Sequence, residues 1–338
     1  YDIKNRRLFL KRSKVGGIEK GDIYVGNTIK IFSRPFLITD YANAHTMRIM
    51  ETKTQKTCGI IKPEAMAKKS EIIRRLMEEG FKLCQLRMMK LNNKVAGEFF
   101  SGYRDSREYP AMVKSLTKGP VLAMELLGNA GISRLLEVAG PEEPEEARRS
   151  APNSLRALYG IDKVNNAFYA TPSGSNPIQA GVLFETDWTN GNYNPCTAVF
   201  NNSVLCIVKP HAVKDGLLGK IMVSIEENGY TITAMKLVHM DIINTEEFYE
   251  VYRDVLPEYS GMVTELISGP CVAMEITSPL GEMTAVQFRK FVGPLDPDIA
   301  KQLRPNTLRA LYGTNKLQNG VHVTDLPEDR LLEVSINI

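Results

Sequence analysis

Short apolar runs alternate with helix-periodic segments through most of the chain. Residues 58–61 and 204–208 are apolar runs that each end at a Lys-Pro pair, which is typical of buried strands. After the second run, apolar residues recur at helical spacing over 217–225 and stop before Asn228-Gly229, a pair that favours the end of a helix. The pattern therefore predicts a strand followed by a helix.

Two further strands are predicted later in the chain. Residues 230–235 and 269–276 have strand-like patterns, and a helical pattern begins between them near Thr245. Strand, helix, strand, helix, strand is the order of a ferredoxin-like α+β sandwich.

Three segments of the chain occur twice, in the same order. The pairs are 60–65 and 207–212, 119–125 and 269–275, and 152–160 and 305–313, with offsets of 147, 150 and 153 residues. Because small insertions between two copies of one domain produce such a drift, the sequence predicts a tandem repeat. We expect the first copy at residues 55–180 and the second copy at residues 201–338.

Two regions lie outside the copies. Residues 1–50 hold strand-like runs at 23–25, 28–32 and 36–39 but too little apolar sequence to bury a core alone, so we expect a β-rich fragment of a domain. Since residue 1 is not Met, we expect the chain to begin inside a longer protein. Residues 181–200 belong to a stretch rich in Pro, Gly, Ser and Asn, which is typical of a linker.

Composition excludes several classes of protein. Hydrophobic residues make up 43% and charged residues 24% of the chain, which is globular rather than disordered composition. A net charge of +3 over 338 residues gives no strong signal for nucleic acid. No apolar run approaches the roughly 18 residues of a membrane span, so we expect no membrane partner. The five cysteines include no C-x-x-C pair, which argues against a zinc site or disulfide framework and favours a reducing compartment.

The second copy carries residues suited to phosphate chemistry. Lys209 follows a predicted strand, Arg289, Arg309 and His322 come later, and Glu333 lies eleven residues beyond the histidine. Guanidinium groups hold phosphate oxygens, and a neutral imidazole can act as a nucleophile while a carboxylate holds its other nitrogen. Because the chain has no Walker loop, a phosphate site must be built from side chains.

Other interpretations stay open for some of these residues. Lys209 and Arg309 recur as Lys62 and Arg156 in the first copy, so they could serve folding instead of binding. The remaining histidines have no such neighbours and are interpreted as ordinary polar residues; they are His45, His211 and His239.

At these residues the chain resembles the nucleoside diphosphate kinase family. The resemblance covers nearly all of residues 55–338 and rests on the I-x-K-P-x-A/G strand end, the G-P-x-x-A-M strand, the L-R-x-x-x-G segment and the N-x-x-H loop. It implies two tandem ferredoxin-like sandwiches. It also implies transfer of the γ-phosphate from a nucleoside triphosphate to a nucleoside diphosphate through a phosphohistidine, with Mg²⁺ bridging the phosphates and no metal ligands from the protein.

The resemblance also implies roles for individual residues. His322 would be the nucleophile and Glu333 its orienting carboxylate. The nucleotide-binding residues implied are Lys209, Tyr249, Arg289, Arg309, Asn319 and Thr324. Two departures weaken the substrate site: Leu295 replaces a phosphate-contacting threonine, and Glu258 replaces a base-stacking phenylalanine, although Tyr259 is adjacent.

The first copy departs further from the family pattern. Tyr169 occupies the position of the nucleophile, and a tyrosine with a pKa of about 10 is a poor phosphate acceptor at neutral pH. Ala180 replaces the carboxylate, and Leu136 lies where Arg289 predicts an arginine, with Arg134 two residues away. The residues that persist are Lys62, Arg156 and Asn166. We therefore expect a degenerate, inactive first site.

A β-rich fragment ahead of two such domains resembles the tandem-domain axonemal members of the family. In this resemblance residues 1–50 are the end of a small N-terminal domain, and the partners are tubulin and neighbouring luminal proteins of doublet microtubules. The implied localisation is cytoplasm and cytoskeleton, in the axoneme of a cilium or flagellum or at the centrosome. Two hypotheses follow: a kinase that works through the second copy, or a structural microtubule inner protein with vestigial kinase sites.

Overall fold

The computed structural model describes residues 6–8, 11, 28–31, 34–39, 41–43, 45–46, 54–171, 178–184 and 195–324. Within these ranges no helix is both long enough and apolar enough to cross a bilayer.

The first copy folds into strands and helices in the expected order. Its elements are β3 (Thr54–Ile61), η2 (Pro63–Lys68), α2 (Lys69–Glu78), β4 (Lys82–Met89), α3 (Asn93–Phe99), η3 (Ser101–Tyr103), α4 (Tyr109–Thr117), β5 (Val121–Asn129), α5 (Gly131–Ala139), α6 (Pro144–Ser150), α7 (Leu155–Tyr159), β6 (Phe168–Ala170) and α8 (Ile178–Phe184).

The second copy repeats this arrangement. Its elements are β7 (Val204–Val208), α9 (Pro210–Lys214), α10 (Leu218–Glu227), β8 (Thr231–Val238), α11 (Ile242–Phe248), η4 (Glu250–Tyr252), α12 (Tyr259–Leu266), β9 (Cys271–Thr277), η5 (Gly281–Met283), α13 (Thr284–Val292), α14 (Pro297–Leu303), α15 (Leu308–Tyr312) and β10 (Val321–Val323). The helix expected near Thr245 begins earlier, because Asp241 caps it by accepting from the Asn244 amide at 2.8 Å.

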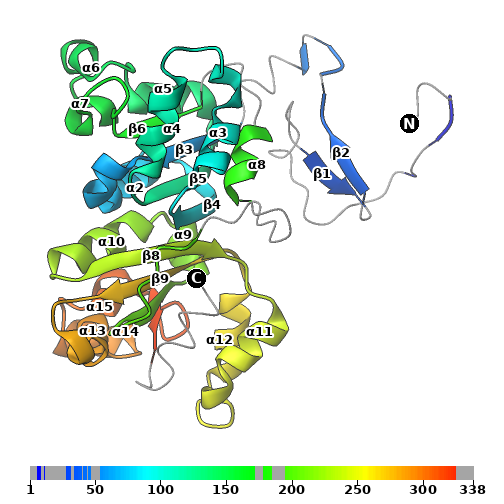
Figure 1. Cartoon of the computed structure of the whole chain (residues 1–338). Coiled ribbons are helices and arrows are strands. Elements are labelled where there is room, and N and C mark those ends of the chain that lie inside the picture. Colours follow the sequence, from blue (N-terminus) through cyan, green and yellow to red (C-terminus); the bar gives the residue numbers. More distant parts are fainter. Residues whose placement is uncertain are drawn as a thin grey trace.

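Eight of the described strands form one continuous sheet in the order β10-β7-β9-β8-β4-β5-β3-β6. All the neighbouring pairs are antiparallel. Within each copy the fourth, first, third and second strands lie side by side, which is the ferredoxin-like order. The expected α+β fold is confirmed, and Figure 1 shows the two copies meeting along β4 and β8.

The seam between the copies has a strand pair and a helix pair. Arg87 of β4 lies opposite Lys236 of β8, and α2 packs on α10. At the helix crossing, a Cβ added to Gly219 would lie 2.2 Å from the Arg74 Cα, so only glycine allows this approach. One hydrophobic core runs through both copies on this face of the sheet.

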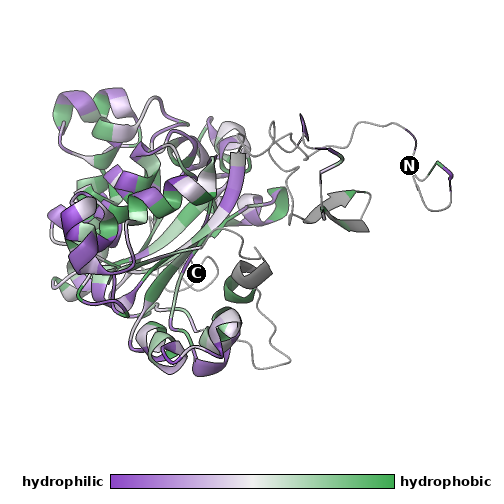
Figure 2. Ribbon diagram, turned by 90° about the horizontal axis from the view of Figure 1, so that it is seen from above, coloured by the Kyte–Doolittle hydropathy of each residue, from purple (hydrophilic) through white to green (hydrophobic). Residues whose placement is uncertain are grey.

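The opposite face of the sheet is covered separately in each copy. In the first copy, α3 and α4 bury a cluster that includes Ile60 and Phe99, and in the second copy α11 and α12 bury a cluster around Ile207 and Tyr249. Figure 2 shows green concentrated on the strands and on the helix sides that face them, with purple on the outer helix faces. This two-sided burial explains why β7 is a continuous apolar run.

The segments outside the two copies are partly described. Near the N-terminus, β1 (Thr28–Ile31) pairs with β2 (Arg34–Leu37), which starts two residues before the strand expected at 36–39. The strand expected at 23–25 lies outside the described residues. In the predicted linker region, α8 packs against α3 and buries Leu183, an element that the composition of this stretch does not predict.

The segment that enters the second copy is fixed by a buried carboxylate. Glu275 of β9 is fully buried and accepts from the amides of Val199 and Phe200, each at 2.8 Å, and from the Thr233 hydroxyl. On the other side of the seam, the Pro195 carbonyl accepts from the Lys90 amide at 3.1 Å. Residues 195–200 are therefore bonded to both copies.

Candidate active site

A cavity of about 780 Å³ opens on the second copy beside β10. It brings together five residues that the sequence singles out: Lys209, Arg289, Arg309, His322 and Thr324. Two further cations that the sequence analysis missed, Lys290 and Arg304, line the same cavity. Its remaining lining is largely apolar.

Local structure explains why these side chains converge. Lys209 directly follows β7 and precedes Pro210, the first residue of α9. At this first helical position the missing amide of proline costs no hydrogen bond. His322 is the middle residue of β10 and pairs with Ile207 of β7, next to the strand end that carries Lys209. Arg309 lies on α15, the short helix before the loop that leads into β10.

Lys209 and Arg309 are anchored by backbone carbonyls. The Lys209 ammonium, only 2% exposed as a residue, donates to the Leu317 carbonyl at 2.9 Å. The Arg309 guanidinium donates to the carbonyls of Val321 at 3.2 Å and Gly293 at 3.0 Å. Burial, together with the neighbouring arginine, lowers the pKa of Lys209 to about 7, and burial lowers that of Arg309 to about 10. Both cations are desolvated beside the cavity.

His322 is buried among aromatic rings and cations. Its ring lies 4.9 Å from that of Phe248 and 5.5 Å from that of Tyr249, measured between centroids. Burial, with the charges of Lys209, Arg309 and Arg289, lowers the pKa of His322 well below its usual value. The imidazole is therefore neutral at pH 7. Its buried Nε2 has no hydrogen-bond partner among the described residues.

Two of the expected site residues that the structure describes, Tyr249 and Asn319, do not line the cavity. Tyr249 is fully buried behind the His322 ring. Asn319 is also fully buried, and its amide donates to the Leu295 carbonyl at 3.1 Å. Its Oδ1 has no hydrogen-bond partner among the described residues. Glu333 lies outside the described residues.

The positions that depart from the family pattern have other contacts. Leu295 lines the cavity and offers its carbonyl to Asn319. Glu258 forms an ion pair with Lys316 at 3.3 Å. The Arg253 guanidinium carbon lies 5.7 Å from the centre of the Tyr259 ring.

The expected residues of the first site make contacts within their own copy. Lys62 donates to Asn166 Oδ1 at 2.7 Å, and Arg156 donates to the Phe168 carbonyl at 3.0 Å. Tyr169 packs edge-on against Phe99 and Phe100 on the face that α3 covers. Burial raises the pKa of the Tyr169 hydroxyl above its ordinary value, which makes it a still poorer nucleophile.

Arg134 does not take the place in the first site that Arg289 has in the second. Arg134 donates to Glu79 at 2.8 Å on the surface, and Leu136 packs against the core.

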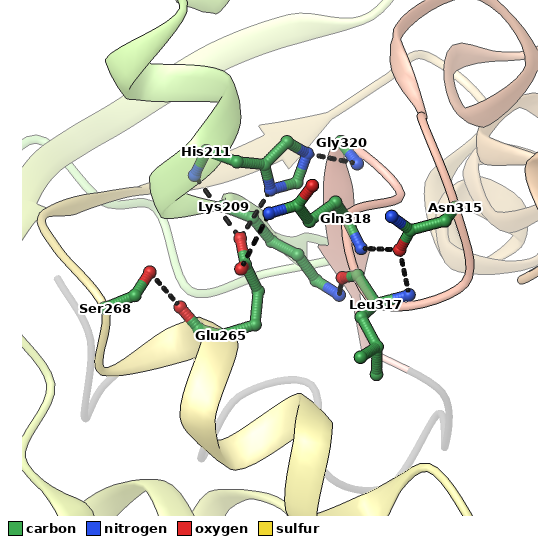
Figure 3. Close-up of polar contacts among 8 residues, drawn as sticks. All are labelled: Lys209, His211, Glu265, Ser268, Asn315, Leu317, Gln318 and Gly320. Atoms are coloured by element: carbon green, nitrogen blue, oxygen red, sulfur yellow. Dashed lines mark hydrogen bonds and ion pairs between the residues drawn. The ribbon is translucent and has the colours of Figure 1, made fainter.

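The sequence analysis also missed the contacts of His211, which lies two residues after Lys209 and outside this cavity. Figure 3 shows its ring between Glu265 and the backbone of Gly320. The Nδ1 atom lies 2.6 Å from Glu265 Oε1, and the Gly320 amide donates to Nε2 at 3.1 Å. The repeat contained the signal, because Lys-Pro-Glu at 62–64 recurs as Lys-Pro-His at 209–211.

The chain is an α+β tandem whose second copy has a cavity lined by cations and a histidine, and comparison with known families identifies its class. The profile of the family described as nucleoside diphosphate kinase matches residues 55–186 and 202–338. The chain belongs to this family, as the resemblance implied. The limits of the domains and of the linker stay a prediction.

Individual relatives support the tandem architecture. The chain is 43% identical over 335 residues to nucleoside diphosphate kinase homolog 7 of Rattus norvegicus, covering 99% of this chain and 84% of the relative. It is 40% identical over 121 residues to the nucleoside diphosphate kinase of Aquifex aeolicus, covering 35% of this chain and 85% of that protein. A solved structure of the Aquifex aeolicus enzyme covers 40% of this chain and 96% of its own, with 37% identity and a TM-score of 0.36. The family profile over both copies and the 43% identity to homolog 7 confirm the expected likeness to that homolog.

Proposed function

We propose that the second copy transfers the γ-phosphate of a nucleoside triphosphate to a nucleoside diphosphate through a phosphohistidine on His322. One observation carries the proposal: a neutral, buried histidine lies beside a cavity that is also lined by Lys209, Arg289 and Arg309. Cations desolvated in this way stabilise the charge that develops on a transferred phosphoryl group.

The reaction needs two displacements. In the first, an imidazole lone pair attacks the γ-phosphorus as its bond to the β,γ-bridging oxygen breaks and a nucleoside diphosphate leaves. In the second, a terminal oxygen of another diphosphate attacks phosphorus, the N–P bond breaks and His322 is restored. Because Nε2 is buried, we propose Nδ1 as the nucleophile.

The other ring nitrogen needs an acceptor for its proton. A buried N–H without a partner costs about 1–3 kcal/mol, and Nε2 has no partner among the described residues. We propose that Glu333 accepts from Nε2–H and stabilises the imidazolium that forms on phosphorylation.

We propose that Mg²⁺ enters with the nucleotide. In the part of the chain that the structure describes, no group of three acidic, histidine or cysteine side chains could hold a metal ion. The cavity presents cations and apolar side chains instead, so the phosphates themselves would supply the ligands.

Labelling with γ-³²P-ATP tests the proposal. The wild-type chain should acquire label that is lost in acid and stable in base, and a nucleoside diphosphate should then remove it. His322→Gln should abolish the label, while circular dichroism shows an unchanged fold. Label that persists in His322→Gln would rule out this histidine, and an unlabelled wild type would rule out the proposed function.

For the place of action we propose the axoneme of a cilium or flagellum, on the inner wall of doublet microtubules. Support comes from the sequence resemblance and from the first site, where a buried tyrosine, Tyr169, stands at the nucleophile position, which fits a copy kept for its structure. A net charge of +3 is too small to retain the chain on an acidic wall by long-range attraction, so we expect shape-matched contacts that resist salt.

Salt extraction of axonemes separates the two hypotheses. Retention at high salt, beside tubulin, is the expected result. Release at low salt together with matrix enzymes would contradict a structural role and leave phosphoryl transfer as the function.

A further inference from the structure

The loop ahead of His322 is held by a two-bond clamp at the start of α9. The Lys209 amide donates to the Gly320 carbonyl at 3.0 Å, and the Gly320 amide donates to His211 Nε2 at 3.1 Å. Gly320 has a φ of +85° and lies two residues before His322, directly after Asn319. Both of these site residues therefore depend on how Gly320 is placed.

The first copy has the same two hydrogen bonds, but a different side chain accepts the second one. There the Lys62 amide donates to the Ala167 carbonyl at 2.9 Å, and the Ala167 amide donates to the Glu64 carboxylate at 2.9 Å. Ala167 also has a positive φ, +70°. The repeat aligns Glu64 with His211 and Ala167 with Gly320, so a histidine has replaced a carboxylate as the acceptor.

A second exchange accompanies the first. The repeat aligns Glu265 with Ser115, whose hydroxyl donates to the Val164 carbonyl at 3.3 Å. In the second copy the Glu265 carboxylate instead lies 2.6 Å from His211 Nδ1, with both side chains about nine-tenths buried. A carboxylate at Nδ1 fixes the proton there and leaves Nε2 as an acceptor.

We infer that His211, held by Glu265 in its Nδ1–H tautomer, positions the loop that carries Asn319 and His322, so that transfer by the second copy depends on the acceptor at His211 Nε2. This inference rests on the proposed function. Without that acceptor the buried Gly320 amide loses its hydrogen bond and the loop must move. The first-copy clamp has the Glu64 carboxylate as its acceptor instead.

Solvent can reach this pair through a second cavity, of about 840 Å³, at the seam between the copies. The charged groups that line it with His211 are Glu265 of α12, Lys214 and Asp215 at the end of α9, and Lys82 of β4 in the first copy. Of these, Glu265 contacts the ring directly.

Steady-state kinetics of the full chain test the inference. His211→Ala should lower kcat by about tenfold or more, with a smaller change in KM, because the nucleophile is misplaced. The double variant H211E/E265S, which installs the first-copy pair, should recover most of the lost kcat. His239→Ala, at an exposed histidine, is the matched control and should behave as wild type.

Nuclear magnetic resonance gives a readout that does not need turnover. Nitrogen-15 spectra should identify His211 as the Nδ1–H tautomer, and His211→Ala should accelerate hydrogen exchange of the Gly320 amide. Wild-type kcat in His211→Ala, or no recovery of kcat in the double variant, would overturn the inference. If the wild type shows no transfer, the proposed function fails, and an Nε2–H tautomer or an unchanged Gly320 amide would still overturn the clamp.

Discussion

A lysine and an asparagine that occur in both copies make different hydrogen bonds in the two sites. In the first copy Lys62 donates to Asn166 Oδ1 at 2.7 Å, so lysine and amide satisfy each other. In the second copy Lys209 donates to the Leu317 carbonyl, and Asn319 Oδ1 has no partner among the described residues. The second site therefore has a buried amide oxygen without a partner among the described residues, at a cost in stability that the first site avoids.

The lowered pKa of Lys209 predicts how nucleotide affinity varies with pH. With a pKa of about 7, Lys209 is increasingly neutral from pH 7.5 to 9, whereas a bound diphosphate favours its ammonium form. Binding should therefore take up a proton, and affinity should weaken as pH rises, by at most about tenfold per pH unit. Calorimetry in buffers of different ionisation enthalpy measures this uptake. Lys209→Met should bind more weakly without it, and pH-independent binding by the wild type would contradict the prediction.

At the scale of elements, the seam depends on the close crossing of α2 and α10. Gly219 lies at this crossing, where a Cβ would meet the Arg74 Cα at 2.2 Å and its amide nitrogen at 2.3 Å. These contacts are with backbone atoms, so no side-chain rotation relieves them. Beside them, Arg87 and Lys236 oppose each other across the strands, so the strand pair alone brings like charges together.

Replacing Gly219 by Ala should therefore destabilise the protein. Alanine favours the helix by about 1 kcal/mol over glycine, but forcing packed backbones apart costs about 1–3 kcal/mol or more. We expect a net loss of about 1–2 kcal/mol in the free energy of unfolding, measured with urea. Lys220→Ala, on the same helix but exposed, is the control and should change little. An equal or more stable Gly219→Ala variant would show that the helices do not cross as described.

At the scale of the whole molecule, the two copies of the repeat pair with each other within one chain. The sheet continues from one copy into the other through β8 and β4, and a single core on one face contains residues of both. The first copy thus supports the second even though its own site has Tyr169 at the nucleophile position.

We therefore expect a monomer in solution. Sedimentation equilibrium should give a mass near 37.8 kDa at micromolar concentration. A stable hexamer would contradict this expectation, because it would mean that the seam within the chain leaves the main pairing surfaces uncovered.

The sequence by itself determined the repeat, the α+β class and the contrast between His322 and Tyr169. Each of these depends on which residue types follow one another along the chain, and strand periodicity and motif order are local properties. The sequence predicted the helix limits less accurately: α11 begins at Ile242, ahead of Thr245, because Asp241 caps it.

Only the tertiary structure decided what each site residue does. His211 looked ordinary in sequence because its partners, Glu265 and Gly320, lie 54 and 109 residues away. The lowered pKa values of Lys209 and His322 arise from burial and from charges brought together by the fold, and neither exists in the extended chain. The order of residues identifies the candidates, but their burial and their hydrogen bonds to residues far away in the sequence determine their pKa values and contacts.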